Sequence, residues 1–235
     1  MQLDDEEYVL QQYRTTENLE TRISVWSADE IGHSPQEVAL SALREISPRR
    51  VLEVGSGNGS FAFRIVGEIG CEVIGLDSSA AMVTASRTLG VETILGDARA
   101  LPFPDASFDA VVAAWMLYHV NPLEQALSEL ARVLHHGGRL IAITNGRSHM
   151  AELWSTVGAN HNEPSFSVEN GADFLSSYFS KVERRSTATY ATFSNRDVAA
   201  KYLRSLNRND LVDELPPAVW PLRARGSTAV FVAQR

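Results

Sequence analysis

Short apolar runs and stretches with helical periodicity alternate along the middle of the chain. One run, residues 108–115, is apolar almost without interruption, which is typical of a strand buried on both faces of a sheet. The other runs are rich in β-branched residues and are bounded by polar residues or glycine. We expect strands at 51–54, 72–76, 93–95, 108–115 and 140–144.

The segments between these strands have the apolar spacing of amphipathic helices. Residues 60–69 follow this pattern, as does the stretch after Ser78 and Ser79, either of which would cap the second helix. Asn121 is the predicted cap of a third helix, which Gly137–Gly138 would end. The apolar stripe of that helix comprises Leu123, Leu127, Leu130 and Leu134. Strands alternating with helices predict right-handed crossovers and an α/β fold, with helices on both faces of a parallel sheet.

The flanks of this central region have a different pattern. Residues 1–48 are predicted to be helical, with Pro35 and Pro48 marking the boundaries of helical segments. Residues 146–180 mix glycine, asparagine, serine and aromatics, which predicts a surface excursion with one helix near 150–157. Further strands are expected at 182–193 and 228–232, with a helix at 198–206.

Composition narrows the class of protein. With 235 residues, 44% hydrophobic and 21% charged, the chain has the make-up of an ordinary globular protein, which excludes global disorder. Its formal net charge of -8 and its scattered arginines argue against a nucleic-acid partner, because phosphate binding favours a basic surface. The oligomeric state is left open.

Cysteine usage and apolar length bear on metal sites and on location. Cys71 is the one cysteine, so an internal disulfide and a cysteine-built metal site are excluded, and we expect no bound metal. Residues 4–7 are acidic where a signal peptide would be basic, and the longest apolar stretch, 110–118, is too short to span a bilayer. We therefore expect a cytoplasmic protein with no membrane partner.

A glycine-rich turn follows the first predicted strand. Residues 53–59 read Glu-Val-Gly-Ser-Gly-Asn-Gly, and glycines permit positive φ angles and close approach of a ligand to the backbone. The alternative is a tight turn that binds nothing. The third glycine does not fall where a dinucleotide fingerprint needs it, since Ser60 stands there, and no P-loop sequence is present. Asp77 and Asp97 end the next two strands, within reach of a ribose and an adenine, so a nucleoside fits better than a dinucleotide.

Four motifs in order now carry a resemblance to a known family. Residues 51–59 and 75–79 resemble the first and second motifs of class I S-adenosylmethionine-dependent methyltransferases. Residues 96–111 are similar to the adenine-side and fourth-strand motifs, and 132–140 resemble the segment before the fifth strand. The resemblance covers about residues 48–145. It implies S-adenosylmethionine as the cofactor and a Rossmann-like, mostly parallel sheet of seven strands, the last antiparallel, with helices on both faces.

The resemblance also implies a division of the chain. Residues 48–145 would be the cofactor-binding core, and 181–235 would complete the sheet. Because such a core has no pocket of its own for the methyl acceptor, residues 1–47 are expected to form a helical lid and 146–180 a substrate cap.

The resemblance assigns roles to matching positions. Gly55 and Gly57 would let the backbone approach the cofactor, Glu53 would orient the turn, and Asp77 would hold the ribose. Met82 would pack on the adenine and Asp97, with the Ala98 amide, would bind its edge; the alternatives are a core methionine and a simple turn carboxylate. The full set of cofactor candidates here is Glu53, Gly55, Ser56, Gly57, Asp77, Ser78, Met82, Asp97, Ala98, Arg99, Ala114 and Trp115.

The residues after the fourth core strand face the place of the acceptor. His119 is the candidate general base, because its unperturbed pKa is near neutral; the alternative is a histidine that holds the next loop. Tyr118 is either a phenol contact to the substrate or part of the core edge. His135 and His136 are interpreted as structural, at the end of a helix.

Neighbouring segments supply further candidates. Arg14 or Arg22 in the lid would pair with the cofactor carboxylate, unless each is only a solvated helix charge. Candidate substrate contacts are Trp26, Met116, His149, Trp154 and Phe166, some of which would be cap core.

The leading hypothesis is a methyltransferase acting at oxygen or nitrogen of a small organic molecule, such as a natural-product intermediate. One rival is a nucleic-acid or protein methyltransferase, disfavoured because Asn121-Pro122 lacks the second proline and the aromatic of the amino-methylating motif. A second is a homologue that binds the cofactor without catalysis. A third, a nicotinamide oxidoreductase, is disfavoured by the glycine spacing.

Overall fold

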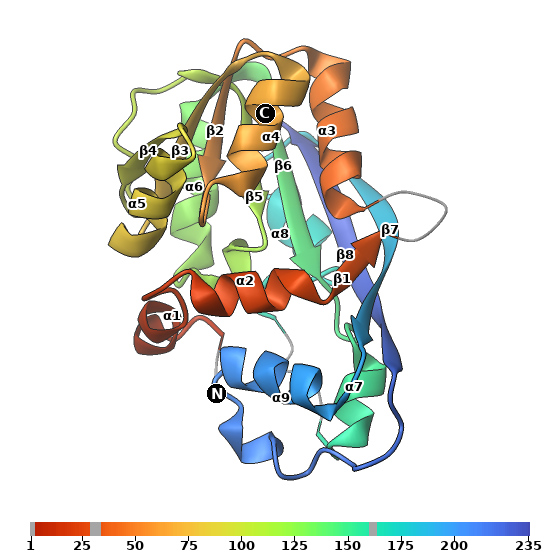
Figure 1. Ribbon diagram of the computed structural model, residues 1–235. Coiled ribbons are helices and arrows are strands. Elements are labelled where there is room, and N and C mark those ends of the chain that lie inside the picture. The colour runs from red at the N-terminus through yellow and green to blue at the C-terminus, as the bar shows by residue number, and fades with distance from the viewer. Residues whose placement is uncertain (1–2, 29–33, 160–163) are drawn as a thin grey trace.

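The core of the protein is one mixed sheet. The computed structural model describes residues 3–28, 34–159 and 164–235 (Figure 1). Its eight strands lie in the order β1-β7-β8-β6-β5-β2-β3-β4. They are β1 (Trp26–Ala28), β2 (Arg50–Val54), β3 (Glu72–Asp77), β4 (Glu92–Leu95), β5 (Phe108–Ala114), β6 (Leu134–Asn145), β7 (Lys181–Phe193) and β8 (Leu222–Gln234).

Strand direction divides the sheet into two parts. From β4 to β6 all neighbours are parallel, whereas β8 runs antiparallel to both β6 and β7. The expected Rossmann-like, mostly parallel sheet with an antiparallel last strand is therefore confirmed. The short strand β1, which pairs with β7, is an addition that the apolar pattern of the sequence did not predict.

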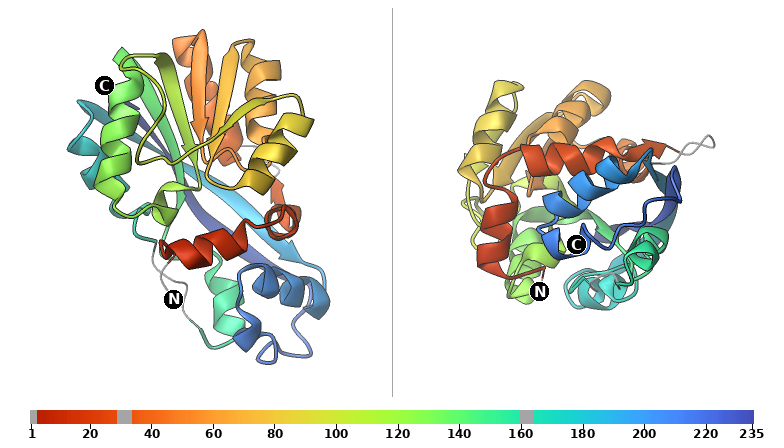
Figure 2. Two further views of the ribbon diagram at one scale, coloured as in Figure 1. Left: turned by 90° about the vertical axis from the view of Figure 1, so that its left-hand side faces the viewer. Right: turned by 60° about the horizontal axis from the view of Figure 1, so that its bottom comes forward.

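Helices cover the sheet on both faces (Figures 1 and 2). They are α3 (Pro35–Ile46), α4 (Ser60–Ile69), α5 (Ala80–Thr88), α6 (Leu123–Val133) and α8 (Gly171–Ser176). Helices α3 and α4 pack on one face through residues such as Leu40 and Ile65. Helices α6 and α8 pack on the other through residues such as Leu127 and Leu175. Each helix buries one apolar stripe, which is the main stabilising contribution of such layers.

The boundary between α6 and β6 differs from the prediction. The cap of α6 is Pro122, without a side-chain hydrogen bond, rather than Asn121. The helix ends at Val133, and the strand begins at once with Leu134, the last residue of the predicted apolar stripe. Gly137–Gly138 lie within β6, where a Cβ on Gly138 would stand 3.0 Å from the Asp109 carbonyl. The glycines allow close strand approach there instead of ending the helix.

A second core lies beyond the carboxyl ends of the parallel strands. It joins α7 (Ala151–Thr156), α9 (Arg196–Ser205), the 3-10 helix η2 (Asn209–Leu211) and the outer parts of β7 and β8. The predicted cap at 146–180 is therefore not one unit. Its first part, α7, lies in the second core, whereas Phe166, α8 and Phe179 pack in the core of the sheet. The helix α9, which was assigned to the segment completing the sheet, packs in the second core instead.

Helices α1 (Glu6–Gln12) and α2 (Glu17–Ser24) cross between the sheet and the second core (Figures 1 and 2). Asp5 caps α1 by accepting a hydrogen bond from the Tyr8 amide. Helix α2 lies beside α9 and leads into β1. None of the helices in the three described ranges combines the length and the apolar character needed to cross a membrane.

Candidate active site

The glycine turn joins β2 to α4 at the carboxyl edge of the sheet. Gly55, Gly57 and Gly59 have φ angles of +68°, +55° and +81°, a region that favours glycine. The amides of Gly55 and Ser56 both donate to the Leu76 carbonyl, at 2.7 and 3.1 Å, which fixes the turn beside β3. The turn is therefore held in place, and its three glycines have no side chains of their own to keep a ligand from the backbone.

Asp77 ends β3 next to this turn. Its carboxylate accepts hydrogen bonds from the Gly57 amide at 2.8 Å and the Ser79 amide at 2.9 Å. Burial raises the pKa of Asp77, and these backbone bonds oppose the rise. The remaining lone pairs of this carboxylate can accept hydrogen bonds from the two hydroxyls of a ribose.

Behind the turn lie two buried polar groups. Burial raises the pKa of Glu53 to about 8, with a smaller contribution from the charge of Asp77, while the Ala62 amide lowers it. Its Oε2 atom and the Oγ atom of Ser56 have no hydrogen-bond partner in the part of the chain that the structure describes. Glu53 is thus protonated at neutral pH, and its free oxygen can orient a ligand or a water at the turn.

On the adenine side, two predicted cofactor ligands contact each other. Both oxygens of Asp97 accept hydrogen bonds from the Arg99 guanidinium, at 2.7–3.1 Å, which lowers the pKa of Asp97. Arg99 also binds the Glu6 carboxylate at 2.8 Å and the Asn121 carbonyl. The pair therefore joins α1 to the core. Met82 is fully buried and Ala98 nearly so.

The end of β5 carries a constrained tryptophan. Trp115 has a φ of 54°, unusual for a residue with a side chain, and such strain is often found at functional sites. Its indole nitrogen donates to Asn145 Oδ1 at 3.2 Å, and Thr228 donates to the same oxygen. Met116 packs against Gly55, where a Cβ would stand 2.6 Å from the Met116 Cβ. Asn145 was not singled out from the sequence. A polar residue at the end of a buried strand is the pattern that could have pointed to it.

His119 lies in the 3-10 helix η1 (Leu117–His119) with both ring nitrogens engaged. Nδ1 is 2.7 Å from the Leu3 carbonyl, so it carries the proton, and Nε2 then accepts from the Tyr13 hydroxyl at 3.0 Å. Burial, with the nearby charge of Arg22, lowers the pKa of His119 to about 4, against the effect of the Leu3 bond. His119 is therefore neutral, and Tyr13, which received no role from the sequence, is its partner.

Tyr118 packs edge-on to the His119 ring, with centroids 4.5 Å apart. Burial raises the pKa of Tyr118 well above its usual value, so the phenol stays protonated. Tyr118 lies within η1, and its partly buried side chain packs against the sheet core, as the second of the two interpretations expects.

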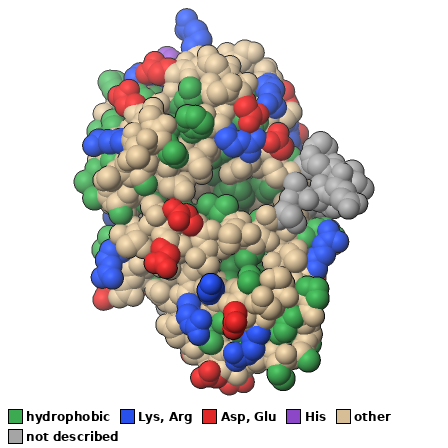
Figure 3. Space-filling view, viewed as in Figure 1, with side chains coloured by type: hydrophobic (Ala, Val, Ile, Leu, Met, Phe, Trp, Pro, Cys, Tyr) green, Lys and Arg blue, Asp and Glu red, His purple; other side chains and the backbone are tan. Residues whose placement is uncertain are grey.

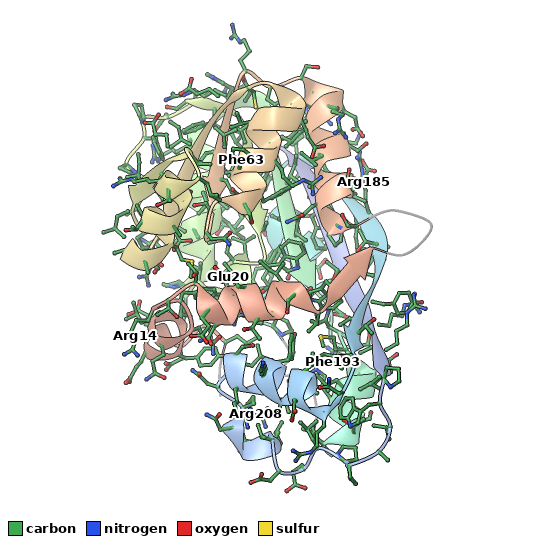
Figure 4. All side chains as sticks on the ribbon, in the orientation of Figure 1. Arg14, Glu20, Phe63, Arg185, Phe193 and Arg208 are labelled. Atoms are coloured by element: carbon green, nitrogen blue, oxygen red, sulfur yellow. The ribbon has the colours of Figure 1, made fainter. Side chains whose placement is uncertain are left out.

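The α1–α2 segment (residues 3–24) roofs this edge of the sheet. Ser79 Oγ donates to the Tyr13 carbonyl at 2.7 Å, and a Cβ on Gly57 would stand 3.2 Å from Leu19. The two candidate arginines differ in their surroundings. Arg14 is exposed at the corner between the helices (Figure 4), whereas Arg22 Nη1 donates to the Ser205 carbonyl in α9. The surface is hollowed between α2 and the helices above it (Figure 3).

The predicted substrate contacts divide between the two cores. Trp26 stacks on His149 at 5.1 Å, and His149 Nδ1 is 3.2 Å from the Ser227 carbonyl. Trp154 is buried in the second core. Phe166 is fully buried in the sheet core, packed edge-on to Phe231, so its prediction as a substrate contact is wrong. A large apolar residue in an irregular segment gives no sign of which core it joins.

The neutral state of His119 has a measurable consequence. Because its pKa is lower in the folded protein than in the unfolded chain, unfolding takes up a proton below pH 6.5, and stability falls as the pH drops towards 4. We expect about 3 kcal/mol of this loss to disappear in His119→Asn. Urea unfolding of both proteins at pH 7 and pH 4.5 measures the difference. Parallel losses in the two proteins would show that His119 is not held neutral.

The residues at this edge fit the cofactor that the motifs imply. Asp77 presents a buried carboxylate paired only with backbone amides, and the turn beside it carries unpartnered polar atoms of Glu53 and Ser56. The three glycines allow close approach to the backbone of the turn, where Met116 and Leu19 now pack against Gly55 and Gly57. The ribose hydroxyls of the cofactor can donate to the Asp77 carboxylate, and its planar adenine can lie close to the glycine backbone.

Comparison with known proteins agrees with this geometry. Residues 52–142 match the family model described as a methyltransferase domain. A ubiquinone/menaquinone biosynthesis C-methyltransferase of Methylobacterium nodulans is 38% identical over 115 residues, covering 44% of this chain and 46% of the relative. A malonyl-[acyl-carrier protein] O-methyltransferase of Methylococcus capsulatus is 27% identical over 193 residues, covering 77% and 70%. The chain spans about half the length of the first curated relatives it matches.

The fold is shared with solved structures. The YcgJ protein of Bacillus subtilis superposes with a TM-score of 0.65 at 18% identity, covering 87% of this chain and 99% of that one. At this identity the likeness concerns the fold alone. The chain is thus similar to methyltransferases over residues 52–142 in sequence, and its sheet has the Rossmann-like order expected of that fold.

Proposed function

We propose that the protein transfers a methyl group from S-adenosylmethionine to a small organic molecule. The observation that carries this proposal is the roof over the strand ends. The α1–α2 segment is tied to the core by the Tyr13–Ser79 and Tyr13–His119 hydrogen bonds and by the Glu6–Arg99 ion pair. A roofed site suits an acceptor that is enclosed whole, whereas a nucleic acid or a protein needs an open groove.

The cofactor supplies an activated methyl group, so the protein mainly has to align the acceptor and exclude water. In this proposal Asp77 holds the ribose, and Gly55 and Gly57 admit the rest of the cofactor to the backbone. The α1–α2 segment excludes water. His119 remains a candidate base, but it would act through Tyr13, whose hydroxyl occupies Nε2.

The acceptor atom is the finer part of the proposal. Oxygen or nitrogen is the hypothesis made from the sequence, and a relative named as an O-methyltransferase supports oxygen. Carbon is a second candidate, because another relative is named as a C-methyltransferase of ubiquinone/menaquinone biosynthesis. Neither relative shares its full length with this chain.

Isothermal titration with S-adenosylmethionine and S-adenosylhomocysteine tests cofactor binding, and we expect both to bind with a stoichiometry of one. NAD⁺ and NADH serve as controls and are expected not to bind. A pooled-metabolite incubation with labelled methyl donor then tests transfer. Binding of a nicotinamide cofactor instead would overturn the proposal. Cofactor binding without labelled product from any metabolite pool would favour the non-catalytic alternative.

A further inference from the structure

Arg22 places a guanidinium in the interior between α2 and α9. Its Nη1 donates to Gln12 Oε1 and, at 3.4 Å, to the Ser205 carbonyl. The guanidinium lies over the Tyr13 ring, 5.1 Å from the ring centroid. Arg22, which belongs to α2, therefore contacts Gln12 and Tyr13 at the end of α1 and Ser205 in α9.

Two hydrogen-bond donors in this interior lack acceptors among the described residues. Arg22 Nη2 and Gln12 Nε2 are both sealed from solvent, and neither has a partner within residues 3–28, 34–159 and 164–235. A buried donor left unpaired is costly, and more so when it belongs to a charged group. Both donors come from the α1–α2 segment, and the described part of the chain supplies an oxygen to neither.

No described carboxylate compensates the charge of Arg22. This charge acts on the buried groups around it, lowering the pKa of His119 and opposing the raised pKa values of Tyr118 and Tyr202. Among the described residues, no carboxylate forms an ion pair with Arg22 or shifts the pKa of these three groups. Because charges inside proteins are normally paired, this place favours a ligand that carries a negative charge.

The side-chain contacts of Arg22 lie away from the glycine turn. They join it to Gln12 and Tyr13 at the end of α1 and to Ser205 in α9, and Tyr13 in turn bonds His119 in η1. We therefore assign Arg22 to the acceptor and not to the cofactor.

We propose that Arg22 and Gln12 bind an acidic oxygen of the methyl acceptor, so that the substrate is an organic acid rather than an amine. This rests on the proposed function, and it replaces the expectation that Arg22 holds the cofactor carboxylate. The α1–α2 segment has to move to admit the acid, because both donors are sealed in the closed form. A carboxylate then accepts from Arg22 Nη2 and Gln12 Nε2, while a cationic amine is repelled.

The test measures acid binding and cofactor binding separately. The protein saturated with S-adenosylhomocysteine is titrated with a panel of aromatic and aliphatic carboxylates, including salicylate, and with their neutral amides. We expect at least one acid to bind more than tenfold more tightly than its amide. Arg22→Gln should weaken that acid about tenfold or more and leave S-adenosylhomocysteine affinity within twofold. Arg204→Gln removes the same charge from an exposed position on α9 and should change neither.

Each contrary result has its own meaning. Loss of S-adenosylhomocysteine affinity in Arg22→Gln would return Arg22 to the cofactor carboxylate and overturn the proposal. So would a panel in which no acid binds better than its amide, or an acid that binds Arg22→Gln as well as the parent. Arg22→Lys, which keeps the charge, should recover part of the acid affinity if Arg22→Gln folds poorly. Failure of the parent protein to bind S-adenosylhomocysteine would instead overturn the proposed function.

Discussion

Asp77→Asn is expected to weaken binding of S-adenosylhomocysteine about a hundredfold, because a carboxylate that would accept two ribose hydroxyls loses its charge and one acceptor. The carboxylate also accepts from the Gly57 amide, so the variant disturbs the glycine turn at the same time. Isothermal titration at pH 7.5 measures the affinity. Thermal unfolding without ligand separates a binding loss from a folding loss.

Asp109→Asn is the matched control for this experiment. Asp109 lies near the amino end of β5, at the end of the parallel strands away from the glycine turn. Its carboxylate also accepts two backbone hydrogen bonds, from Arg49 at 2.8 Å and Arg50 at 2.9 Å. Its replacement is expected to leave the affinity unchanged. Equal losses in both variants would mean that Asp77 acts only through the fold, and unchanged affinity in Asp77→Asn would place the ribose elsewhere.

Gly59→Ala is expected to lower the free energy of unfolding by about 2–5 kcal/mol, from backbone strain and overpacking together. Gly59 has a φ of +81°, and an added Cβ would stand 2.2 Å from Ser86 Oγ and 2.8 Å from the Ser86 Cα. Because Ser86 is hydrogen-bonded to Thr93 in the interior, α5 would have to shift away from α4. Urea unfolding monitored by tryptophan fluorescence gives the free energy.

Gly70→Ala isolates the strain. Gly70 ends α4 with a φ of +75°, and no atom lies within 4 Å of an added Cβ. We expect a loss of about 1–2 kcal/mol there, from the left-handed backbone alone. If Gly59→Ala cost no more than Gly70→Ala, the packing of the turn against Ser86 would not be as tight as the structure has it.

The parallel part of the sheet could be predicted because its signals are local. Each strand from β2 to β5 is a β-rich or apolar run ending at a turn, and the helices between them carry apolar stripes. The start of β6 could not be predicted in this way. Leu134 continues the stripe of α6, and nothing near it in the sequence shows that the backbone has become extended. The three residues of β1 are too few to form a pattern.

The site shows the same division between local and distant contacts. Asp77 at a strand end and the glycines before α4 are signals within one βα unit, so the sequence located them. The Tyr13–His119 bond joins residues 106 apart, and spacing carries no information about it. Asp97 and Arg99 were each assigned to the cofactor, yet they form an ion pair with each other. A carboxylate two residues from an arginine is close enough to pair with it without any other part of the chain.

The ladder between β7 and β8 runs unbroken from Lys181 opposite Gln234 to Phe193 opposite Leu222. Over Leu222–Ser227, β8 continues beyond its pairing with β6 and stays paired with β7, so the two strands join the second core to the sheet. On the other side, side chains and the short β1 hold α1 and α2 in place. If the proposed function is right, the α1–α2 segment is the part that opens to admit reactants, and the second core sets the shape of the space it covers.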